Sequence, residues 1–238
     1  MSDFRRPTLC FLGCLLGLAL ASGRAAAAEF PPFEAGERLI YRLRWPSGIT
    51  LGEAIFEVSR QGEELHFAVN LEARLPQYRV SYSFSSVATR ETLCSLRYEQ
   101  TLKEGTRNSE ETIEFDQAAH RARRTSNRQT TSVEIPECAR DPLTFIYFVR
   151  SRLAAGQPAE PSSVHFGRSI PLRLEASGPE RVNVLGTPRP AEKVQVNFPR
   201  GNSEPTIEVW FAPDDARTPL RVTLPTPLAD FSAELERQ

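Results

Sequence analysis

A strict alternation of apolar and polar side chains constrains the fold of this chain more than any other feature. It is clearest over residues 65–75, where every second residue from Leu65 to Leu75 is apolar and most residues between them are polar. A period of two places all the apolar side chains on one face of an extended strand, whereas a helix would scatter them around its axis. The segment therefore predicts a β-strand with one buried face.

The same alternation recurs along most of the chain. Glycine- and proline-containing turns separate the first runs at intervals of about ten residues, which is typical of an antiparallel meander. Prolines in the carboxyl-terminal half are expected to mark strand ends or sheet edges, because proline cannot donate to a central ladder. The runs predicted as strands are residues 39–45, 54–58, 65–75, 78–87, 96–102, 111–115, 120–124, 130–135, 163–166, 171–176, 181–185, 191–198, 206–211, 220–224 and 231–235.

One segment breaks the alternation and predicts a helix over residues 141–155. Asp141 is a favoured N-cap, and Pro142 suits the first helical position. Gly156 is placed to end the helix, because glycine readily adopts the left-handed conformation that follows a last turn. Arg150 and Arg152 fall in the last turn, where a positive charge complements the helix dipole.

The side chains of this helix predict where it lies. Ile146, Tyr147 and Phe148, with their apolar neighbours, cover nearly the whole circumference. A helix that is apolar on all sides is buried on most of them. We therefore expect a mainly β (α+β) fold, with a large curved antiparallel sheet or open β-barrel that holds the 141–155 helix in its concave face.

The first 28 residues have the three parts of a secretory signal peptide. Arg5 and Arg6 precede an apolar run, Leu9 to Ala21, and the small residues 25–28 follow. The apolar run is too short to span a bilayer as a helix. The sequence thus predicts cleavage near Ala28, export to the periplasm without a remaining transmembrane anchor, and a single β-rich domain over residues 29–238.

Cleavage would leave Cys94 and Cys138 in a compartment that oxidises thiols. A pair with no third cysteine most simply forms a disulfide, which would stabilise the fold by up to about 4 kcal/mol. Two free thiols or a catalytic thiol remain alternatives at this point. Neither cysteine has a histidine nearby in the sequence, which argues against catalysis.

The sequence offers no constellation of residues for catalysis, metal binding or cofactor binding. His66, His120 and His165 are not at the spacing of metal ligands, and no nucleophile or phosphate-binding motif is present. A formal net charge of −1 argues against a protein that binds nucleic acid. We therefore expect no catalytic residue, no metal and no cofactor.

Two charged stretches each allow a functional and a structural interpretation. Asp214 and Asp215 could form a carboxylate pair, but their place after Pro213 and between two predicted strands favours a turn. The basic run from Arg121 to Arg124 could contact anionic lipid, although a solvated hairpin is the simpler interpretation.

Four stretches of the sequence resemble a bacterial envelope family called domain of unknown function 3108. They are residues 33–45 (FEAGERLIYRLRW), residues 52–54, the predicted helix at 141–150 and a closing hairpin at 208–220 that contains Trp210, Asp214, Asp215 and Arg217. Together they span about residues 33–235. The resemblance implies export and a β-rich fold, and it supplies no reaction and no catalytic residues.

These observations lead to three hypotheses of function. The first is an exported, non-enzymatic envelope protein that binds an apolar or amphipathic ligand, such as a lipid, or a lipoprotein partner, because curved sheets can enclose such ligands. The second is a scaffold or assembly factor that acts through an exposed sheet edge. The third, a hydrolase, is disfavoured because the sequence supplies no nucleophile–base pair.

Overall fold

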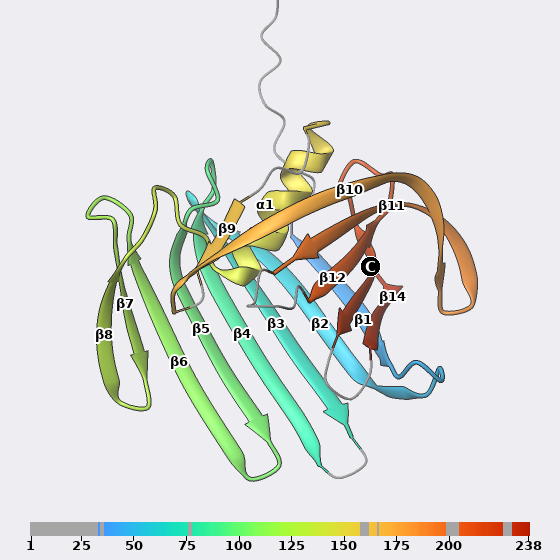
Figure 1. Cartoon of the computed structure of the whole chain (residues 1–238), viewed down its shortest axis with the longest axis horizontal. Helices are drawn as coiled ribbons and strands as arrows, with labels where there is room; N and C mark the ends of the chain where they lie inside the picture. The colour runs from blue at the N-terminus through green and yellow to red at the C-terminus, as the bar shows by residue number, and fades with distance from the viewer. Residues whose placement is uncertain are drawn as a thin grey trace, which may run out of the picture.

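A computed structural model describes residues 33, 36–75, 78–157, 162–165, 167–198, 205–225 and 230–238. The predicted signal peptide lies outside these residues, as does Phe166 at the end of one predicted strand. Within the described ranges the chain forms one 14-stranded antiparallel sheet and one α-helix (Figure 1). This architecture confirms the predicted fold class.

The elements follow the predicted runs closely. They are β1 (Glu37–Arg44), β2 (Thr50–Gln61), β3 (Glu64–Arg74), β4 (Arg79–Thr89), β5 (Ser95–Glu104), β6 (Arg107–Asp116), β7 (Arg121–Ser126), β8 (Gln129–Glu134), α1 (Pro142–Ala154), β9 (Ser162–His165), β10 (Ser169–Val184), β11 (Thr187–Asn197), β12 (Thr206–Phe211), β13 (Pro219–Pro225) and β14 (Asp230–Arg237). One expectation was wrong: the strands predicted at 171–176 and 181–185 are a single strand, β10, with an irregularity between Ala176 and Pro179.

The sheet consists of two meanders that are joined through the first and last strands. The strand order is β8-β7-β6-β5-β4-β3-β2-β1-β14-β13-β12-β11-β10-β9. Strand β1 pairs with β14 in an antiparallel ladder in which Tyr41 lies opposite Leu235. The two ends of the chain's folded part therefore lie at the centre of the sheet, and β8 and β9 form its edges.

Several prolines lie inside strands, at positions where a neighbouring strand is missing. Pro188 and Pro190 belong to the part of β11 that pairs with β10, whereas β12 pairs with β11 only from Glu192 onward. Pro171 lies in the part of β10 that extends beyond its ladder with β11. These prolines therefore lie where the strand has a ladder partner on one side only, so the absence of a backbone N–H is tolerated. The expectation that the prolines would lie only between strands or at sheet edges is refined accordingly.

The sheet rolls until its two edge regions meet through side chains. The ring of His165 at the end of β9 lies 5.6 Å from the ring of Phe115 on β6, measured between centroids. A Cβ added to Gly167 would lie 2.8 Å from Nε of Arg124 on β7, so the corner between β9 and β10 packs directly on this strand. The result is an open barrel without a ladder between its edges in the described part of the chain.

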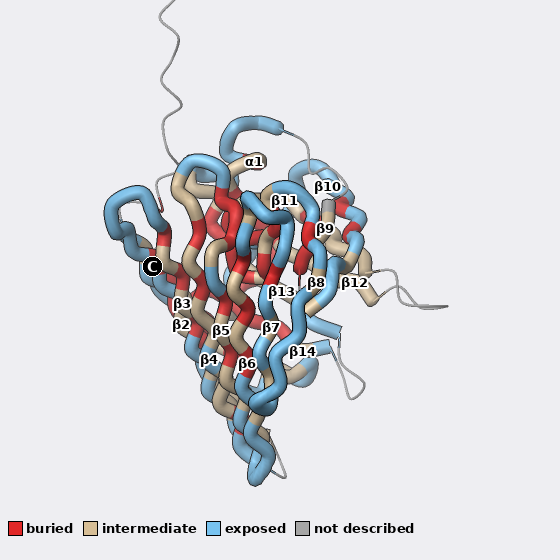
Figure 2. The backbone as a smooth tube through the Cα atoms, turned by 90° about the vertical axis from the view of Figure 1, so that its left-hand side faces the viewer, coloured by how far each residue is buried: buried red, intermediate tan, exposed pale blue. Residues whose placement is uncertain are grey.

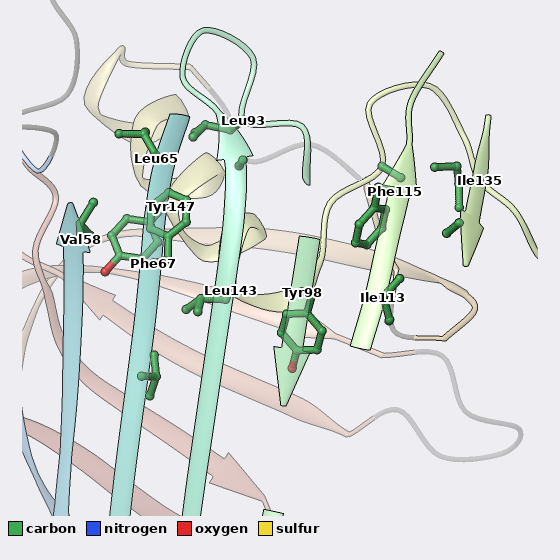
Figure 3. Close-up of a cluster of buried hydrophobic side chains, with 14 of the residues drawn as sticks. Val58, Leu65, Phe67, Leu93, Tyr98, Ile113, Phe115, Ile135, Leu143 and Tyr147 are labelled. Atoms are coloured by element: carbon green, nitrogen blue, oxygen red, sulfur yellow. The ribbon is translucent and has the colours of Figure 1, made fainter. Parts of the chain in front are cut away.

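Helix α1 lies between the two halves of the rolled sheet. Leu143 and Tyr147 belong to a buried cluster with residues of β2–β6, where the Tyr147 ring stacks on Phe67 with centroids 4.4 Å apart (Figure 3). Phe145 and Val149 belong to a second cluster with residues of β9–β12. The helix is thus held in the concave face, as the sequence predicts.

The burial of the helix is less complete than its composition predicts. The side chain of Ile146 is 38% exposed, and Phe148 is only partly buried, with the Arg140 guanidinium 3.7 Å from its ring centroid. Arg150 does not lie at the surface of the last turn; it is fully buried, and only Arg152 occupies the expected position. Ile146 is exposed because the sheet covers the helix from two sides and leaves one stripe open, whereas Arg150 is buried because it faces Glu37 of β1.

The alternating strand direction sorts the turns of the first meander into two groups (Figure 1). The turns β2–β3, β4–β5 and β6–β7, and the segment after β8, lie beside α1 at what we call the helix end. The turns β1–β2, β3–β4 and β5–β6 lie at the opposite end, which we call the open end. The adjoining ends of β13 and β14 also lie at the open end, because β14 runs antiparallel to β1.

Candidate functional site

The helix end is closed by hydrogen bonds around the N-cap of α1. The carboxylate of Asp141 is fully buried; its Oδ1 accepts from the backbone N–H groups of Leu143 and Thr144 at 2.8 and 3.0 Å. Its Oδ2 accepts from the hydroxyls of Ser86, Ser95 and Thr144 at 2.6, 2.5 and 2.9 Å. Burial raises the pKa of Asp141, and these donors oppose the rise. The network fixes the start of the helix to β4 and β5.

A disulfide reinforces the same attachment. Cys94, after β4, is bonded to Cys138, in the segment before α1, with Cα atoms 4.7 Å apart. Beside it, the backbone N–H of Ser95 donates to the carbonyl of Ala139 at 3.0 Å. The expected disulfide is therefore present, and it tethers the β4–β5 turn to the loop that leads into the helix.

A buried ion pair links the helix to the first strand. The guanidinium of Arg150 donates to both carboxylate oxygens of Glu37 at 2.7 and 2.8 Å, and to the carbonyl of Ala216 at 3.1 and 3.2 Å. Burial disfavours the charged guanidinium, but the hydrogen bonds to Glu37 outweigh this and raise the pKa of Arg150. Sequence reasoning missed this pair; the one signal was Arg150 directly after the apolar run of the helix.

On strand β3, the burial of the concave-face side chains decreases toward the open end. On β3, Leu65, Phe67 and Val69 are 0%, 2% and 5% exposed, whereas Leu71 and Ala73, which face the same way, are only partly buried. Figure 2 shows the same change as red segments that give way to tan and blue toward the tips of β2–β6. The helix does not extend over these positions.

Strand β13 shows the same gradient, and β4 shows part of it. On β13, Leu220 is 1% exposed, Val222 is partly buried, and Leu224 is 37% exposed. On β4, Tyr82 lies opposite Leu71 in the ladder and is also only partly buried, although Val80, opposite Ala73, is 6% exposed. Part of the apolar surface at the open end of the concave face, at Leu71, Tyr82 and Leu224, is therefore incompletely covered by the described chain.

A polar stripe borders this apolar surface on β5–β7. Gln100 and Glu111 lie opposite each other in the ladder, and each is 6% exposed. The Oε2 atom of Glu111 accepts a hydrogen bond from Nη2 of Arg124 at 2.6 Å. Glu111 Oε1, Arg124 Nε and His165 Nε2 are buried without a hydrogen-bond partner. Burial lowers the pKa of His165, although Glu111 opposes this effect, so the imidazole is neutral near pH 7.

The closing hairpin is built as a turn. The Asp214 carboxylate accepts from the N–H of Thr218 at 2.9 Å, while Asp215 is exposed. Arg217 has a left-handed φ of 48° and pairs with Glu192 at 3.0 Å. The Trp210 ring has Arg221 5.5 Å and Lys193 5.7 Å from its centroid. These contacts give the four motif residues a structural setting, with Trp210 buried in the cluster that also holds Leu39 and Tyr41.

The remaining polar candidates do not assemble into a reactive site. Neighbouring arginines of β7 point to opposite faces of the sheet, so the basic run does not form one patch. Arg123 pairs with Glu114, whereas Arg124 pairs with Glu111 on the concave face. His66 lies 3.4 Å from Glu64. No group of three or more histidine, cysteine or acidic residues suited to a metal ion occurs among the described residues.

These features define a class of protein: a rolled, barrel-like antiparallel sheet that encloses one helix and leaves one end of its concave face open. The chain belongs to the family described as "Protein of unknown function (DUF3108)", whose model matches residues 40–236. This match confirms the resemblance seen in the sequence.

A solved structure shares the fold. A β-barrel-like protein of domain of unknown function DUF1849 from Brucella abortus aligns over 84% of this chain and 95% of its own, with a TM-score of 0.62 and 11% identity. A protein described as a possible lipoprotein from Parabacteroides distasonis aligns over 87% and 96%, with a TM-score of 0.34 and 10% identity. No curated protein matches the sequence. In the described part of the chain, no helix is long and apolar enough to cross a bilayer.

Proposed function

We propose that this protein is an exported, non-enzymatic envelope protein that binds an apolar or amphipathic ligand on the open end of its concave face. The observation that carries the proposal is the loss of burial along β3 and β13 of the concave face, from Leu65 and Leu220 to Leu71 and Leu224 at the open end. A ligand that covers this surface removes apolar area from water without reorganising the core beneath it.

The chemistry of the face favours a ligand with an apolar tail and a polar group. Each methylene that is buried against Leu71, Phe56 or Val222 would contribute about 0.8 kcal/mol. The neighbouring polar stripe, with Gln100 and Arg124, would meet the polar group. A long-chain fatty acid or the acyl chains of a lipid or lipoprotein have both parts.

Two features support action outside the cytoplasm. Residues 1–28 have the pattern of a signal peptide, and Cys94 is disulfide-bonded to Cys138. Disulfides persist mainly in oxidising compartments such as the bacterial periplasm. We therefore place the ligand-binding role in the periplasm.

Titration with a fluorescent fatty acid, dansyl-undecanoic acid, tests the proposal. Leu71→Asp adds a charge to the concave face, whereas Asn70→Asp adds the same charge to the opposite face of the same strand. We expect only Leu71→Asp to weaken probe binding, with thermal melts confirming that both variants fold. Equal binding by the two variants, or no binding by the native protein, would contradict the proposal.

A second candidate function rests on the free edge strand β8. Its side chains are mostly exposed, and it contains neither proline nor lysine to block pairing with another chain. Such an edge can accept an extended segment of a partner as an added strand, as a scaffold would. Native mass spectrometry of protein purified from the periplasm separates the two functions: bound lipid supports the first, and lipid-free protein supports the second.

A further inference from the structure

The exposed large apolar side chains gather at the open end. Among the described residues they are Ile49, Tyr78, Ile146 and Leu224, with exposed fractions of 64%, 39%, 38% and 37%. All except Ile146 lie in turns or strand ends at the open end (Figure 1). Exposed apolar side chains that cluster in this way mark a surface that contacts something other than water.

Direct contacts hold these turns side by side. The Trp45 ring, after β1, packs edge-on against Phe231 of β14 with centroids 4.8 Å apart. The backbone N–H of Gly105, in the β5–β6 turn, donates to the carbonyl of Arg79 at 3.0 Å. The ladder between β2 and β3, in which Gly52 pairs with Ala73, joins the β1–β2 turn to the β3–β4 turn. The apolar tips therefore belong to one surface.

The same surface carries exposed positive charge. Arg74, Arg79, Lys103 and Arg107 are exposed, and none has a carboxylate within 4.0 Å among the described residues. Arg74 and Arg79 even lie opposite each other in the β3–β4 ladder, where like charges destabilise a sheet. A function at this surface would account for charges that stability alone disfavours.

The helix end has the opposite charge. Its turns and loops present exposed carboxylates and fewer arginines, although the whole chain has a formal net charge of only −1. The exposed carboxylates there are Glu63, Glu64, Glu91, Asp116, Glu134 and Glu137. The open end also exposes Asp230, but exposed basic side chains outnumber it at these turns, and this positive end is also the one with exposed apolar tips.

We propose that the open end docks onto the surface of an anionic lipid bilayer. Apolar and aromatic tips enter the interface between headgroups and acyl chains, while arginine and lysine contact the negative headgroups. This orientation points the open end of the concave face at the bilayer. The inference rests on the proposed function, because the bilayer then supplies or receives the apolar ligand.

Vesicle flotation tests the docking surface. The mature protein is mixed with vesicles of phosphatidylglycerol and phosphatidylethanolamine, and separately with phosphatidylcholine vesicles. We expect binding to the anionic vesicles that weakens with salt. The triple variant Arg74→Gln, Arg79→Gln, Lys103→Gln should lose about fivefold in affinity per charge, or roughly 100-fold in all.

A matched triple variant at the helix end, Arg38→Gln, Arg60→Gln, Arg121→Gln, removes the same charge and should bind as the native protein does. For the apolar tips, Ile49→Ser should weaken binding, and Ile146→Ser, at the other exposed isoleucine, should not. Equal losses in the two triple variants, or equal binding to phosphatidylcholine vesicles, would overturn the proposal. So would a dimer in sedimentation that Ile49→Ser converts to a monomer, because the tips would then join two copies.

Binding of dansyl-undecanoic acid by the same samples separates this inference from the proposed function. Probe binding without vesicle binding overturns the docking surface and leaves the ligand face intact. Vesicle binding without probe binding supports the docking surface and contradicts the ligand face.

Discussion

The helix end and the open end of this barrel use the same strands in different ways. At the helix end, a disulfide, a buried N-cap and a buried ion pair fasten α1 to β1, β4 and β5. At the open end, inward side chains such as Leu71 on β3 and Val222 on β13 are only partly covered, and the turns expose apolar and basic residues. One end of the barrel thus fastens the helix, and the other is the end at which we propose binding.

The largest expected difference between the ends concerns the buried ion pair. Glu37→Ala leaves the Arg150 guanidinium buried without its carboxylate, which should cost about 3–5 kcal/mol of unfolding free energy. Arg38→Ala removes the neighbouring exposed pair with Glu57 and should cost no more than about 1 kcal/mol. Urea unfolding measures the free energy of both variants. Equal losses in the two variants would mean that the buried ion pair does not stabilise the helix end.

The stacked aromatic core of the helix end should respond nearly as strongly. Tyr147→Ala deletes a ring that is 1% exposed and stacked on Phe67, at a cost of about 3–5 kcal/mol. Tyr78→Ala deletes a similar ring at the open end and should change stability by only about 0.5 kcal/mol. Comparable losses in thermal melts would show that the open end also contributes to the core.

Loss of the disulfide should have the next largest effect. The double variant Cys94→Ser, Cys138→Ser should lose up to about 4 kcal/mol, because the unfolded chain regains the freedom that the cross-link removes. Alkylation mass spectrometry of the native, unreduced protein should find no free thiol. Ligand binding at the open end should survive the substitution under conditions where the variant remains folded.

A smaller effect is expected from pH. Burial lowers the pKa of His165 below its ordinary value of 6.5, so the unfolded chain binds the proton more readily than the folded chain. Stability should therefore rise with pH up to about 6.5 and fall as the solution becomes more acidic. His165→Gln should flatten this dependence, which urea unfolding at a series of pH values measures.

Local sequence signals predicted much of the helix end. Asp141, Pro142 and Gly156 placed the helix to within a residue, because capping depends on neighbours in the chain. The alternation over 65–75 placed β3 and its buried face for the same reason. The pairing of Arg150 with Glu37 could not be predicted, because it depends on how a distant strand packs against the helix.

The open end was much less predictable. Leu65 and Leu71 fall on one apolar face in the sequence, yet the first is buried and the second is not, because α1 covers only part of the sheet. The pairing of β1 with β14, which brings Trp45 to Phe231, likewise depends on the whole sheet order. Periodicity identifies a face, and only the three-dimensional arrangement shows where that face is covered.

Methyl NMR during a titration with oleate tests the central claim most directly. Leu71, Leu102 and Val222 lie on the concave face toward the open end, and Leu65 lies on the same face beneath the helix. We predict that the methyl signals of the first three residues shift with oleate while those of Leu65 change little. Unshifted signals at all four residues, or shifts centred on Leu65, would contradict a ligand-binding face at the open end.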